Sequence, residues 1–307
     1  MCRLMAYLGD PVPLEDLLYR PDASLVRQAV DPQLMSLLNL GGFGFAAWAP
    51  GTRDPDTPLT YRVATIPTFD RNLRTLAAKV EAAALVAHVR GVGYDARERV
   101  GMQNVHPFLL EGATIALAHN GDLHDFARMR ADLQSEIRPE LAAMVEGTTD
   151  SEWIYALVLS MLDDPFGAVG VEDAAAAVEG AIERLGGLRE AHGIGVQSPV
   201  NLVLSDGHWL IATRFTFDYG WYPSDESFFG SEREHDFTTL WYAPGGCEGE
   251  AENGSGVAPR ATTSVVVASE PLTKSFAGWL EAPEYSMLLV APRDGGGLGV
   301  EIRDLGL

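Results

Sequence analysis

The second residue of the chain, Cys2, is a side chain that could carry out covalent chemistry. Its small size favours removal of Met1, which would leave a cysteine with a free α-amino group. Such an amine has a reference pKa of about 7.7–8.0, so it can act as a base toward the neighbouring thiol at neutral pH. The sequence therefore predicts a terminal nucleophile, although the position alone also fits a buried, unreactive cysteine in an edge strand.

An arginine and a histidine stand at the ends of short segments that could reach a substrate. Arg90 ends the apolar run Ala87-His88-Val89-Arg90, where its forked guanidinium could clamp a carboxylate. A solvated surface ion pair is the alternative. His106 lies within Asn104-Val105-His106-Pro107-Phe108, just before a proline-fixed turn, and a lone histidine in such a place is often structural.

Asn120 and Gly121 follow the apolar run Ile115–Ala118, at the point where a buried strand would leave the core. An asparagine amide beside a glycine N–H supplies two hydrogen-bond donors directed at one point, and glycine lets the backbone approach a substrate closely. These residues therefore predict an oxyanion hole. A plain Asn-Gly turn is the alternative.

Thr148-Thr149-Asp150-Ser151-Glu152 opens a predicted helix, where Asp150 or Thr149 would serve as an N-cap. A metal site is not expected, because His119 and His124 are five residues apart rather than the four that place two ligands on one helical face. A phosphate-binding loop is not expected either, because Gly41-Gly42-Phe43-Gly44 lacks both the Walker lysine and the full dinucleotide-binding spacing.

Hydrophobic periodicity predicts the elements that must position these residues. The predicted strands are Cys2–Leu8, Gly41–Trp48, Leu59–Ile66, Ala84–Val89, Ala113–Ala118, Val200–Leu204, Trp209–Thr213, Thr239–Ala243, Thr262–Ala268 and Met287–Ala291. The predicted helices are Pro13–Tyr19, Asn72–Lys79, Phe126–Ile137, Ser151–Leu162 and Val171–Leu188. Strands followed by helices and then by strands favour an α+β layered fold over a βαβ series. The glycine-rich, acidic stretch Gly245–Pro259 is predicted to be a surface loop.

Composition limits the classes of partner. The 307 residues carry 22 Lys+Arg and 43 Asp+Glu, a net charge of −21 that would repel nucleic-acid phosphates and anionic membrane surfaces. Two cysteines, Cys2 and Cys247, cannot form a disulfide scaffold or a multi-thiolate metal site. No secretory signal or membrane-spanning run is recognisable, so a cytoplasmic location is expected.

The ordered set Cys-Arg, Gly-Phe-Gly, His-Val-Arg, Asn-Val-His-Pro-Phe, His-Asn-Gly and Thr-Asp-Ser-Glu resembles the class II glutamine amidotransferases, which are N-terminal-nucleophile hydrolases. The resemblance extends to Asn201–Asp206 and Ala268-Ser269-Glu270-Pro271-Leu272 near the end. Arg20-Pro21-Asp22-Ala23-Ser24, Gln28 and a long middle insertion look most like the branch that degrades glutathione by γ-glutamyl cleavage. The start of the chain also resembles the ergothioneine-pathway γ-glutamyl hydrolase.

The resemblance implies a four-layer αββα sandwich formed by one domain over residues 1–307, with insertions near 163–198 and 215–260. It implies that Cys2 attacks the γ-carbonyl of a glutamyl group and that Asn120 and Gly121 stabilise the oxyanion. Arg90 would hold the substrate α-carboxylate and Asp150 its α-ammonium, while His106 would shape the pocket. The chemistry implied needs no metal or organic cofactor.

Three local features depart from the family pattern. Asn39-Leu40-Gly41-Gly42 replaces Asn-Ala-Asp-Gly, so an acidic group is missing. Gly91-Val92-Gly93 follows Arg90 in place of small hydroxyl residues that would bond the glutamyl head. Phe215–Pro259 has no assigned counterpart, and its Trp221, Tyr222 and Trp241 could reshape the leaving-group pocket.

Three functions fit these observations. The first is hydrolysis of a γ-glutamyl amide in glutamine or in a small γ-glutamyl peptide or conjugate. The second is a glutaminase subunit that supplies ammonia to a separate protein partner. The third is a catalytically silent scaffold or binding protein that keeps the fold, for which the departures at Gly41, Val92 and Gly93 are the main support.

Overall fold

The computed structural model describes residues 2–34, 38–92, 100–221, 239–245 and 262–306. Tyr222, Cys247, Gly93 and most of the expected insertion at 215–260 lie outside the described residues, as does the expected loop Gly245–Pro259 after its first residue.

The first sheet, sheet A, holds the N-terminal strand at its centre. Within the described chain it has seven antiparallel strands, in the spatial order β11 (Leu280–Glu281), β9 (Trp241–Pro244), β10 (Ser264–Ala268), β1 (Arg3–Pro13), β4 (Glu81–Val89), β2 (Phe43–Trp48) and β3 (Leu59–Val63). Strand β1 therefore pairs on both edges, with β10 from late in the chain and with β4. Two paired edges fix the position of the residues that begin β1.

The second sheet, sheet B, is also antiparallel. Its strands lie in the order β13 (Leu298–Asp304), β12 (Ser286–Pro292), β7 (Leu210–Arg214), β6 (Ser198–Ser205) and β5 (Ala116–Gly121), and the short strand β8 (Thr216–Phe217) pairs with β6. Strand β5, which carries the predicted oxyanion residues, is the edge strand of this order.

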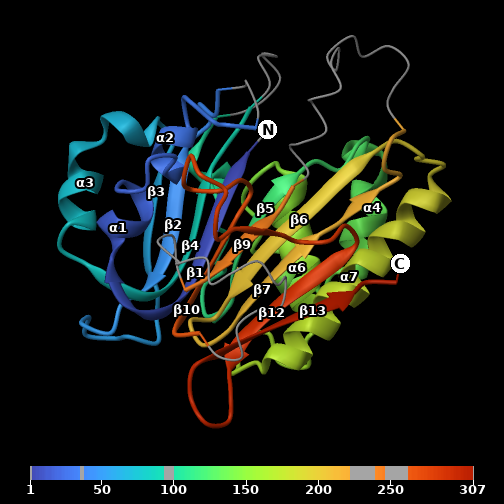
Figure 1. The fold of residues 1–307 in the computed structure, drawn as a ribbon. Coiled ribbons are helices and arrows are strands. Elements are labelled where there is room, and N and C mark those ends of the chain that lie inside the picture. The colour runs from blue at the N-terminus through green and yellow to red at the C-terminus, as the bar shows by residue number, and fades with distance from the viewer. Residues whose placement is uncertain (1, 35–37, 93–99, 222–238, 246–261, 307) are drawn as a thin grey trace.

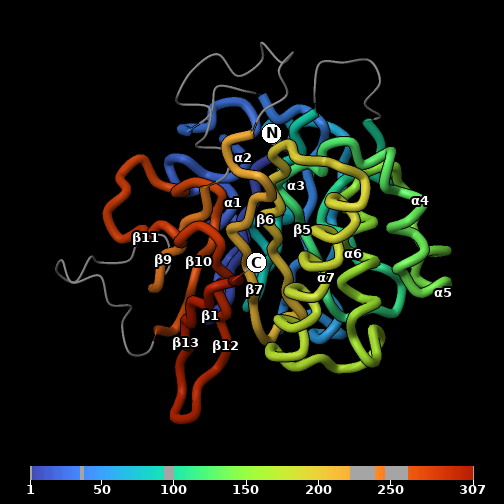
Figure 2. Tube along the Cα trace, turned by 90° about the vertical axis from the view of Figure 1, so that its right-hand side faces the viewer, coloured from blue at the N-terminus to red at the C-terminus, as the bar shows by residue number. Residues whose placement is uncertain are grey.

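Helices cover the outer face of each sheet (Figure 1). Sheet A carries α1 (Leu14–Leu18), α2 (Leu25–Gln28) and α3 (Arg71–Ala77), and sheet B carries α4 (Phe126–Glu136), α5 (Pro139–Ala142), α6 (Asp150–Met161) and α7 (Val171–Ala191). Short 3₁₀ turns lie at η1 (Pro67–Phe69) and η2 (Met102–Asn104). Figure 2 shows α6 and α7 beside β5 and β6. The predicted four-layer αββα sandwich is confirmed.

Three apolar clusters correspond to the three interfaces between the four layers. One joins sheet A to its helices, one lies between the two sheets, and one joins sheet B to its helices. Side chains alternate faces along a strand, so Met5 of β1 points toward the helices while Leu4 and Ala6 point between the sheets. By the same alternation, the positions of Cys2, Arg90 and Asn120 belong to the inter-sheet side, at the ends of β1, β4 and β5.

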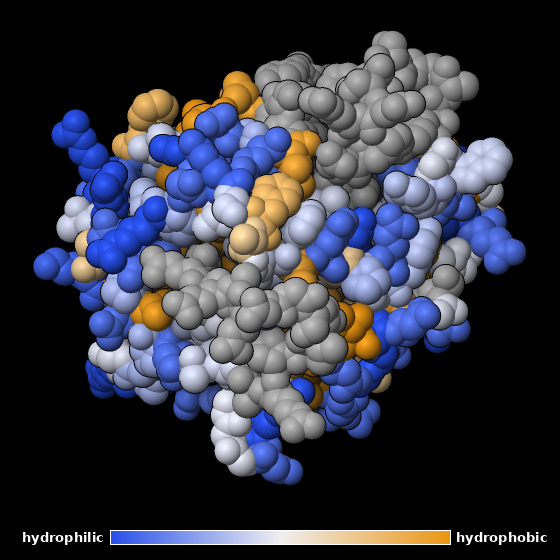
Figure 3. All heavy atoms as spheres, viewed as in Figure 1, coloured by the Kyte–Doolittle hydropathy of each residue, from blue (hydrophilic) through white to orange (hydrophobic). Residues whose placement is uncertain are grey.

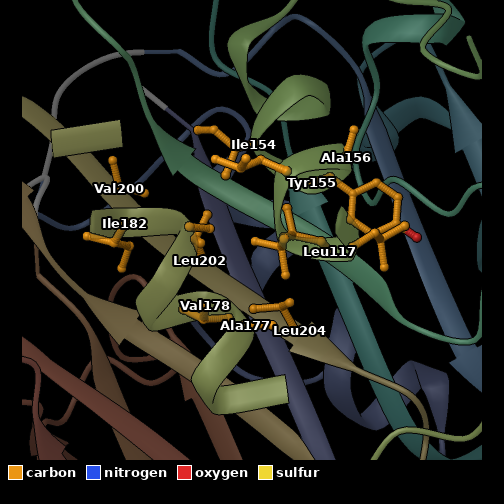
Figure 4. Close-up of a cluster of buried hydrophobic side chains, with 14 of the residues drawn as sticks. Leu117, Ile154, Tyr155, Ala156, Ala177, Val178, Ile182, Val200, Leu202 and Leu204 are labelled. Atoms are coloured by element: carbon orange, nitrogen blue, oxygen red, sulfur yellow. The ribbon is translucent and has the colours of Figure 1, made fainter. Parts of the chain in front are cut away.

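Helix α6 is anchored firmly because it is apolar on all sides, and its residues from Ser151 to Leu159 are buried. In Figure 4, Ile154 and Tyr155 of α6 and Val178 and Ile182 of α7 lie among the apolar side chains of β5 and β6. The Tyr155 hydroxyl donates a 2.6 Å hydrogen bond to the carbonyl oxygen of Ile115, just before β5. This packing fixes the first residue of α6, Asp150, next to the end of β5.

The predicted helices and strands are present with shifted ends. Strand β13 was not predicted, although Leu298, Val300 and Ile302 alternate with Gly299, Glu301 and Arg303 as an amphipathic strand should. The four-residue helices α2 and α5 were not predicted either, because they are too short to show helical periodicity. In the described part of the chain, no helix is long and apolar enough to cross a membrane. Figure 3 shows one face of the molecule covered mainly by hydrophilic side chains.

Candidate active site

A cavity of about 460 Å³ lies where the ends of β1, β4 and β5 meet the start of α6. Five of the six predicted site residues line it: Cys2, Arg90, His106, Gly121 and Asp150. A larger, shallower hollow of about 710 Å³ lies between Leu40 and Asn72, but its lining contains no cysteine or histidine. The smaller cavity is therefore the candidate site.

The Cys2 sulfur is held by the backbone that follows Arg90. The N–H of Gly91 donates to Cys2 Sγ over 3.3 Å. Burial raises the pKa of the Cys2 thiol above its ordinary value, while the Gly91 N–H and the charge of Arg90 act in the opposite direction and Asp150 adds to the rise. Because burial dominates, the thiol needs a base close by in order to become a nucleophile.

A buried ion pair holds the main chain at Cys2. Arg3 donates through Nη1 to the Cys2 carbonyl oxygen over 3.1 Å, and its Nε lies 3.4 Å from Glu270 Oε2. Glu270 also accepts the backbone N–H groups of Gln33 and Leu34, each over 2.9 Å. Removing one member of a buried pair typically costs about 3–5 kcal/mol, so this network fixes the entry to β1 strongly.

Arg90 continues β4 by two backbone hydrogen bonds. Its N–H donates to the Gly42 carbonyl and its carbonyl accepts the Gly41 N–H, both over 2.8 Å. The side chain is 6% exposed and lines the cavity. Arg90 is therefore not a solvated surface residue, which answers the alternative raised by the sequence.

Asn120 and Gly121 are the last two residues of β5, so the plain Asn-Gly turn considered above is wrong. The Asn120 Nδ2 atom donates to Ser269 Oγ over 3.1 Å, and its Oδ1 has no hydrogen-bond partner among the described residues. A Cβ atom at Gly121 would lie 1.8 Å from the Pro199 carbonyl oxygen. Only glycine allows the end of β5 to lie this close to Pro199 of the neighbouring strand β6. Without a side chain, the backbone at Gly121 is also open to the cavity.

Ser269 connects Asn120 to the start of strand β1. Its hydroxyl oxygen also accepts the Leu4 N–H over 3.1 Å, and its own N–H donates to the Leu4 carbonyl over 3.0 Å. Ser269 directly follows β10 and is buried. One side chain thus ties the start of β1 in sheet A to the Asn120 carboxamide in sheet B.

Asp150 is the first residue of α6, and the N-cap is Thr149, which makes no side-chain cap hydrogen bond. The Asp150 carboxylate accepts the Leu123 N–H over 2.7 Å through Oδ2 and the Ser151 N–H over 2.8 Å through Oδ1. Oδ1 also lies 3.2 Å from the Ser151 hydroxyl, whereas Oδ2 retains acceptor capacity beyond its bond to Leu123. The carboxylate is thus fixed in the cavity wall and able to accept a bond from a cation.

His119 supports the same wall from behind. Its Nε2 lies 3.2 Å from the Pro199 carbonyl, which can only accept, so Nε2 carries the proton. Nδ1 therefore accepts the Ser151 hydroxyl over 2.9 Å. Burial lowers the pKa of His119, so the ring is neutral in this arrangement, and the charge of Asp150 opposes that shift. Among the described residues, no group of three or more His, Cys, Asp or Glu side chains is placed so that it could hold a metal ion.

His106 is buried in the cavity wall, with its ring centroid 4.1 Å from that of His88 and 4.6 Å from that of Phe108. Neither of its ring nitrogens has a hydrogen-bond partner among the described residues. Burial, followed by the neighbouring His88, His119 and Arg90, lowers the pKa of His106 well below its ordinary value. Burial likewise lowers the pKa of His88 to about 3. Both rings are neutral at physiological pH.

Three contributors to the site were not singled out from the sequence. Gly91 acts through its backbone N–H, which leaves no signal in its side chain. Ser151 was considered only as a first-turn residue, although its hydroxyl links His119 to the start of α6. Ser269 was noted only as part of the Ala268–Leu272 segment, and its contact with Asn120 spans 149 residues of sequence.

The chain is similar to known proteins along most of its length. Residues 42–228 match the family described as glutamine amidotransferases class-II. The probable glutamine amidotransferase DUG3 of Saccharomyces cerevisiae is 28% identical over 312 residues, which cover 94% of this chain and 82% of that protein. Both the family match and the match to the yeast protein extend over more than half of the chain.

Solved structures show the same similarity. A glutamine aminotransferase class-II domain protein from Silicibacter pomeroyi is 25% identical with a TM-score of 0.61, and the match covers 99% of both chains. The glutamine phosphoribosylpyrophosphate amidotransferase of B. subtilis has a TM-score of 0.57 at 15% identity, over 99% of this chain and 49% of that one. The second match supports the fold alone, with this chain spanning about half of that protein.

The buried neutral histidines predict a loss of stability in acid. In the folded chain, His88, His106 and His119 have lowered pKa values, so below about pH 6.5 the unfolded chain binds more protons than the folded one. The contribution of these three neutral histidines to the free energy of unfolding is complete above about pH 6.5, and it declines as the pH falls toward their folded-state pKa values. With a folded pKa of about 3, His88 accounts for about 2 kcal/mol of the free energy of unfolding lost between pH 7 and pH 5.

Urea unfolding at pH 7 and pH 5 checks this expectation. His88→Gln should lose about 2 kcal/mol less than the wild type over this interval, whatever its stability at pH 7. His208→Gln, at an exposed position, is the matched control and should lose as much as the wild type. Equal losses for His88→Gln and the wild type would contradict the assignment.

Proposed function

Because the chain belongs to the class II glutamine amidotransferases, a family of hydrolytic enzymes, we propose that it uses Cys2 to hydrolyse a γ-glutamyl amide bond and release glutamate. The substrate is glutamine or a small γ-glutamyl peptide or conjugate. The observation that carries this proposal is the single cavity that Cys2 shares with Arg90, Gly121 and Asp150. A nucleophile, a cation, an open backbone position and a carboxylate are the groups that an acyl transfer on an amino-acid side chain requires.

Opposite charges in the cavity match the two ends of an amino acid. The Arg90 guanidinium binds the substrate α-carboxylate by paired hydrogen bonds, and the Asp150 carboxylate accepts from the α-ammonium. Asp150 suits this role because the Leu123 and Ser151 N–H groups hold both of its oxygens in place. With the head held at both charges, the γ-carbonyl extends toward Cys2. His106, neutral and buried, closes the cavity wall without adding a charge.

The nucleophile is activated after removal of Met1, when the α-amine belongs to Cys2 itself. The neutral amine takes the thiol proton, and the sulfur attacks the γ-carbonyl carbon to form a tetrahedral oxyanion. Collapse breaks the C–N bond, and the protonated amine gives its proton to the leaving nitrogen. Water, deprotonated by the same amine, then attacks the γ-glutamyl thioester, and glutamate leaves as the thiol is restored.

Asn120 and Gly121 stabilise the oxyanion in both halves of this reaction. Loss of one such donor typically costs about 2.7–4 kcal/mol of transition-state stabilisation. The Ser269 hydroxyl can donate as well as accept, so a half-turn of the Asn120 carboxamide lets Ser269 donate to Oδ1 and turns Nδ2 toward the side now occupied by the unpartnered oxygen. We assign Ser269 as the positioning residue for this donor.

An active enzyme is favoured over a silent scaffold. The Gly41 and Val92 departures leave Cys2, Arg90 and Asp150 around one cavity, and the Cys2 sulfur keeps its hydrogen bond to Gly91. Neither departure removes a group that the proposed chemistry uses.

The nucleophile is tested by comparing the two cysteines of the chain. Cys2→Ala should reduce glutamate release from glutamine, glutathione and γ-glutamyl amines by at least about 1,000-fold, because a thioester needs a thiol and Cys2 is the cysteine among the described residues that line the cavity. Cys247→Ala is the matched control and should keep its activity. Intact-mass analysis of active protein should show that Met1 is absent. Similar activity in both cysteine variants would overturn the proposal, and activity that appears only with an added protein would favour a glutaminase subunit.

Asp150→Asn tests recognition of the α-ammonium. A hydrogen bond to a charged group contributes about 1.5–3 kcal/mol, so KM for glutamine should rise about 10- to 100-fold with a smaller change in kcat. Asp125→Asn is the control, since Asp125 is exposed and pairs with Arg128 outside the cavity. An unchanged KM in Asp150→Asn would leave Asp150 with a structural role at the start of α6.

Ser269→Ala tests the positioning of Asn120. Because the carboxamide loses the partner that orients it, kcat should fall about 10-fold or more while KM changes little, short of the 100-fold or greater loss expected for Asn120→Ala. Ser269→Thr retains the hydroxyl and should recover most of the activity. If Ser269→Ala and Ser269→Thr are impaired equally, the hydroxyl is not the group that matters.

A further inference from the structure

The three residues that follow β4 serve different parts of the cavity. Arg90 lines it, the Gly91 N–H donates to Cys2 Sγ over 3.3 Å, and Val92 is half-buried beside Gly41. We call Arg90, Gly91 and Val92 the strap. One short stretch of backbone therefore carries both the cation that meets the substrate and the donor that meets the nucleophile.

The backbone of Gly41 packs directly against the strap. A Cβ atom added at Gly41 would lie 2.6 Å from Val92 Cγ1 and 3.1 Å from both Arg90 Cγ and the Arg90 carbonyl oxygen. Carbon atoms do not approach one another to 2.6 Å without displacement, so the Val92 methyl group occupies the space that any side chain at position 41 would need. Gly41 is buried and donates its N–H to the Arg90 carbonyl over 2.8 Å, which holds the backbones at this separation.

We propose that Val92 and Gly41 are positioning residues that act as one unit, in which the packing of the Val92 methyl group on the bare Gly41 backbone sets the place of the Arg90 guanidinium and of the Gly91 N–H. The two departures from the family pattern noted in the sequence are thus in direct contact with each other. The missing side chain at position 41 is what makes room for the branched side chain at position 92.

This pairing has a consequence for specificity. Val92 places an apolar group beside the stem of Arg90, so the strap offers the substrate head the Arg90 charge without a neighbouring side-chain hydroxyl. Within the strap, recognition of the α-carboxylate therefore depends on the Arg90 guanidinium alone, so small shifts of the strap change KM strongly. This part of the inference rests on the proposed function, whereas the effect on Cys2 does not.

Gly41→Ala is the direct test, since it places one methyl group against Val92. Overpacked sites are costly to accommodate, so KM for glutamine should rise at least about 10-fold. As the Gly91 N–H moves away from Sγ, alkylation of Cys2 by iodoacetamide should become at least about threefold slower at neutral pH, with its pH profile displaced upward. Both measurements use the Cys247→Ala background, so that Cys2 is the only thiol that reacts.

The double variant Gly41→Ala/Val92→Ala removes both Val92 methyl groups, including the one that the new Cβ meets. Because this relieves the overpacking, it should return both measurements to within about threefold of the parent. Gly51→Ala is the matched control, because a Cβ there meets nothing within 4 Å, and it should behave as the parent. Should Gly41→Ala fail to fold, recovery of folding and activity in the double variant supports the proposal by itself.

Three results would overturn the inference: unchanged KM and alkylation in Gly41→Ala, a double variant no better than the single one, or loss of folding in both. The alkylation rate is measured without substrate, so it separates the inference from the proposed function. If Cys2→Ala remained active, the hydrolytic mechanism would fail, while the effect of Gly41→Ala on the Cys2 thiol would still decide whether the strap is seated as described.

Discussion

Antiparallel pairing of β1 with β4 is the constraint on which the site depends. Leu4 lies opposite His88 and Arg3 opposite Val89, so the start of one strand is level with the end of the other. The side chains alternate between faces, and this register brings Cys2 and Arg90 to the same inter-sheet side. A shift of the register by one residue would turn one of them toward the helices. The register of the backbone hydrogen bonds between β1 and β4 therefore determines that Cys2 and Arg90 lie on the same side of sheet A.

Burial of neutral imidazoles lets the few charges of the cavity act strongly. His88, His106 and His119 are desolvated, and nearby Arg90 further discourages protonation of His88 and His106. For the proposed substrate, a ring that stays neutral neither repels the α-ammonium nor competes with Arg90 for the α-carboxylate. Burial of Arg90 also weakens the dielectric screening of its charge, so Arg90 interacts with a bound ligand more strongly than a surface arginine would.

The parts of the site that sequence could predict are those whose chemistry is local. Cys2, Arg90, Gly121 and Asp150 each stand at the end of an apolar run or at the start of a helix, and the structure brings these positions to one cavity. Ser269 could not be recognised in this way, because its meaning comes from a contact with Asn120 across 149 residues. From the sequence, Gly41 indicated only a missing acidic group and Val92 only a missing hydroxyl. Their contact in three dimensions shows that the two positions belong together. Periodicity located most of the strands and the longer helices, whereas the four-layer arrangement came from the family resemblance; strand β13 was overlooked although its alternation is visible in the sequence.

The central position of β1 also affects the order in which the protein assembles. Its partner β10, together with Ser269 and Glu270, comes from the last fifth of the chain, and the Leu4–Ser269 contact alone closes a loop of 265 residues. Contacts of such long range form late, because the entropy of closing the loop must be overcome first. During synthesis β1 is made well before its partner β10, so one of its two edges is paired late. In a nascent chain Ser269 therefore cannot join the start of β1 to Asn120 until the C-terminal strands have docked, so the cavity around Cys2 is complete only when the whole sandwich has formed.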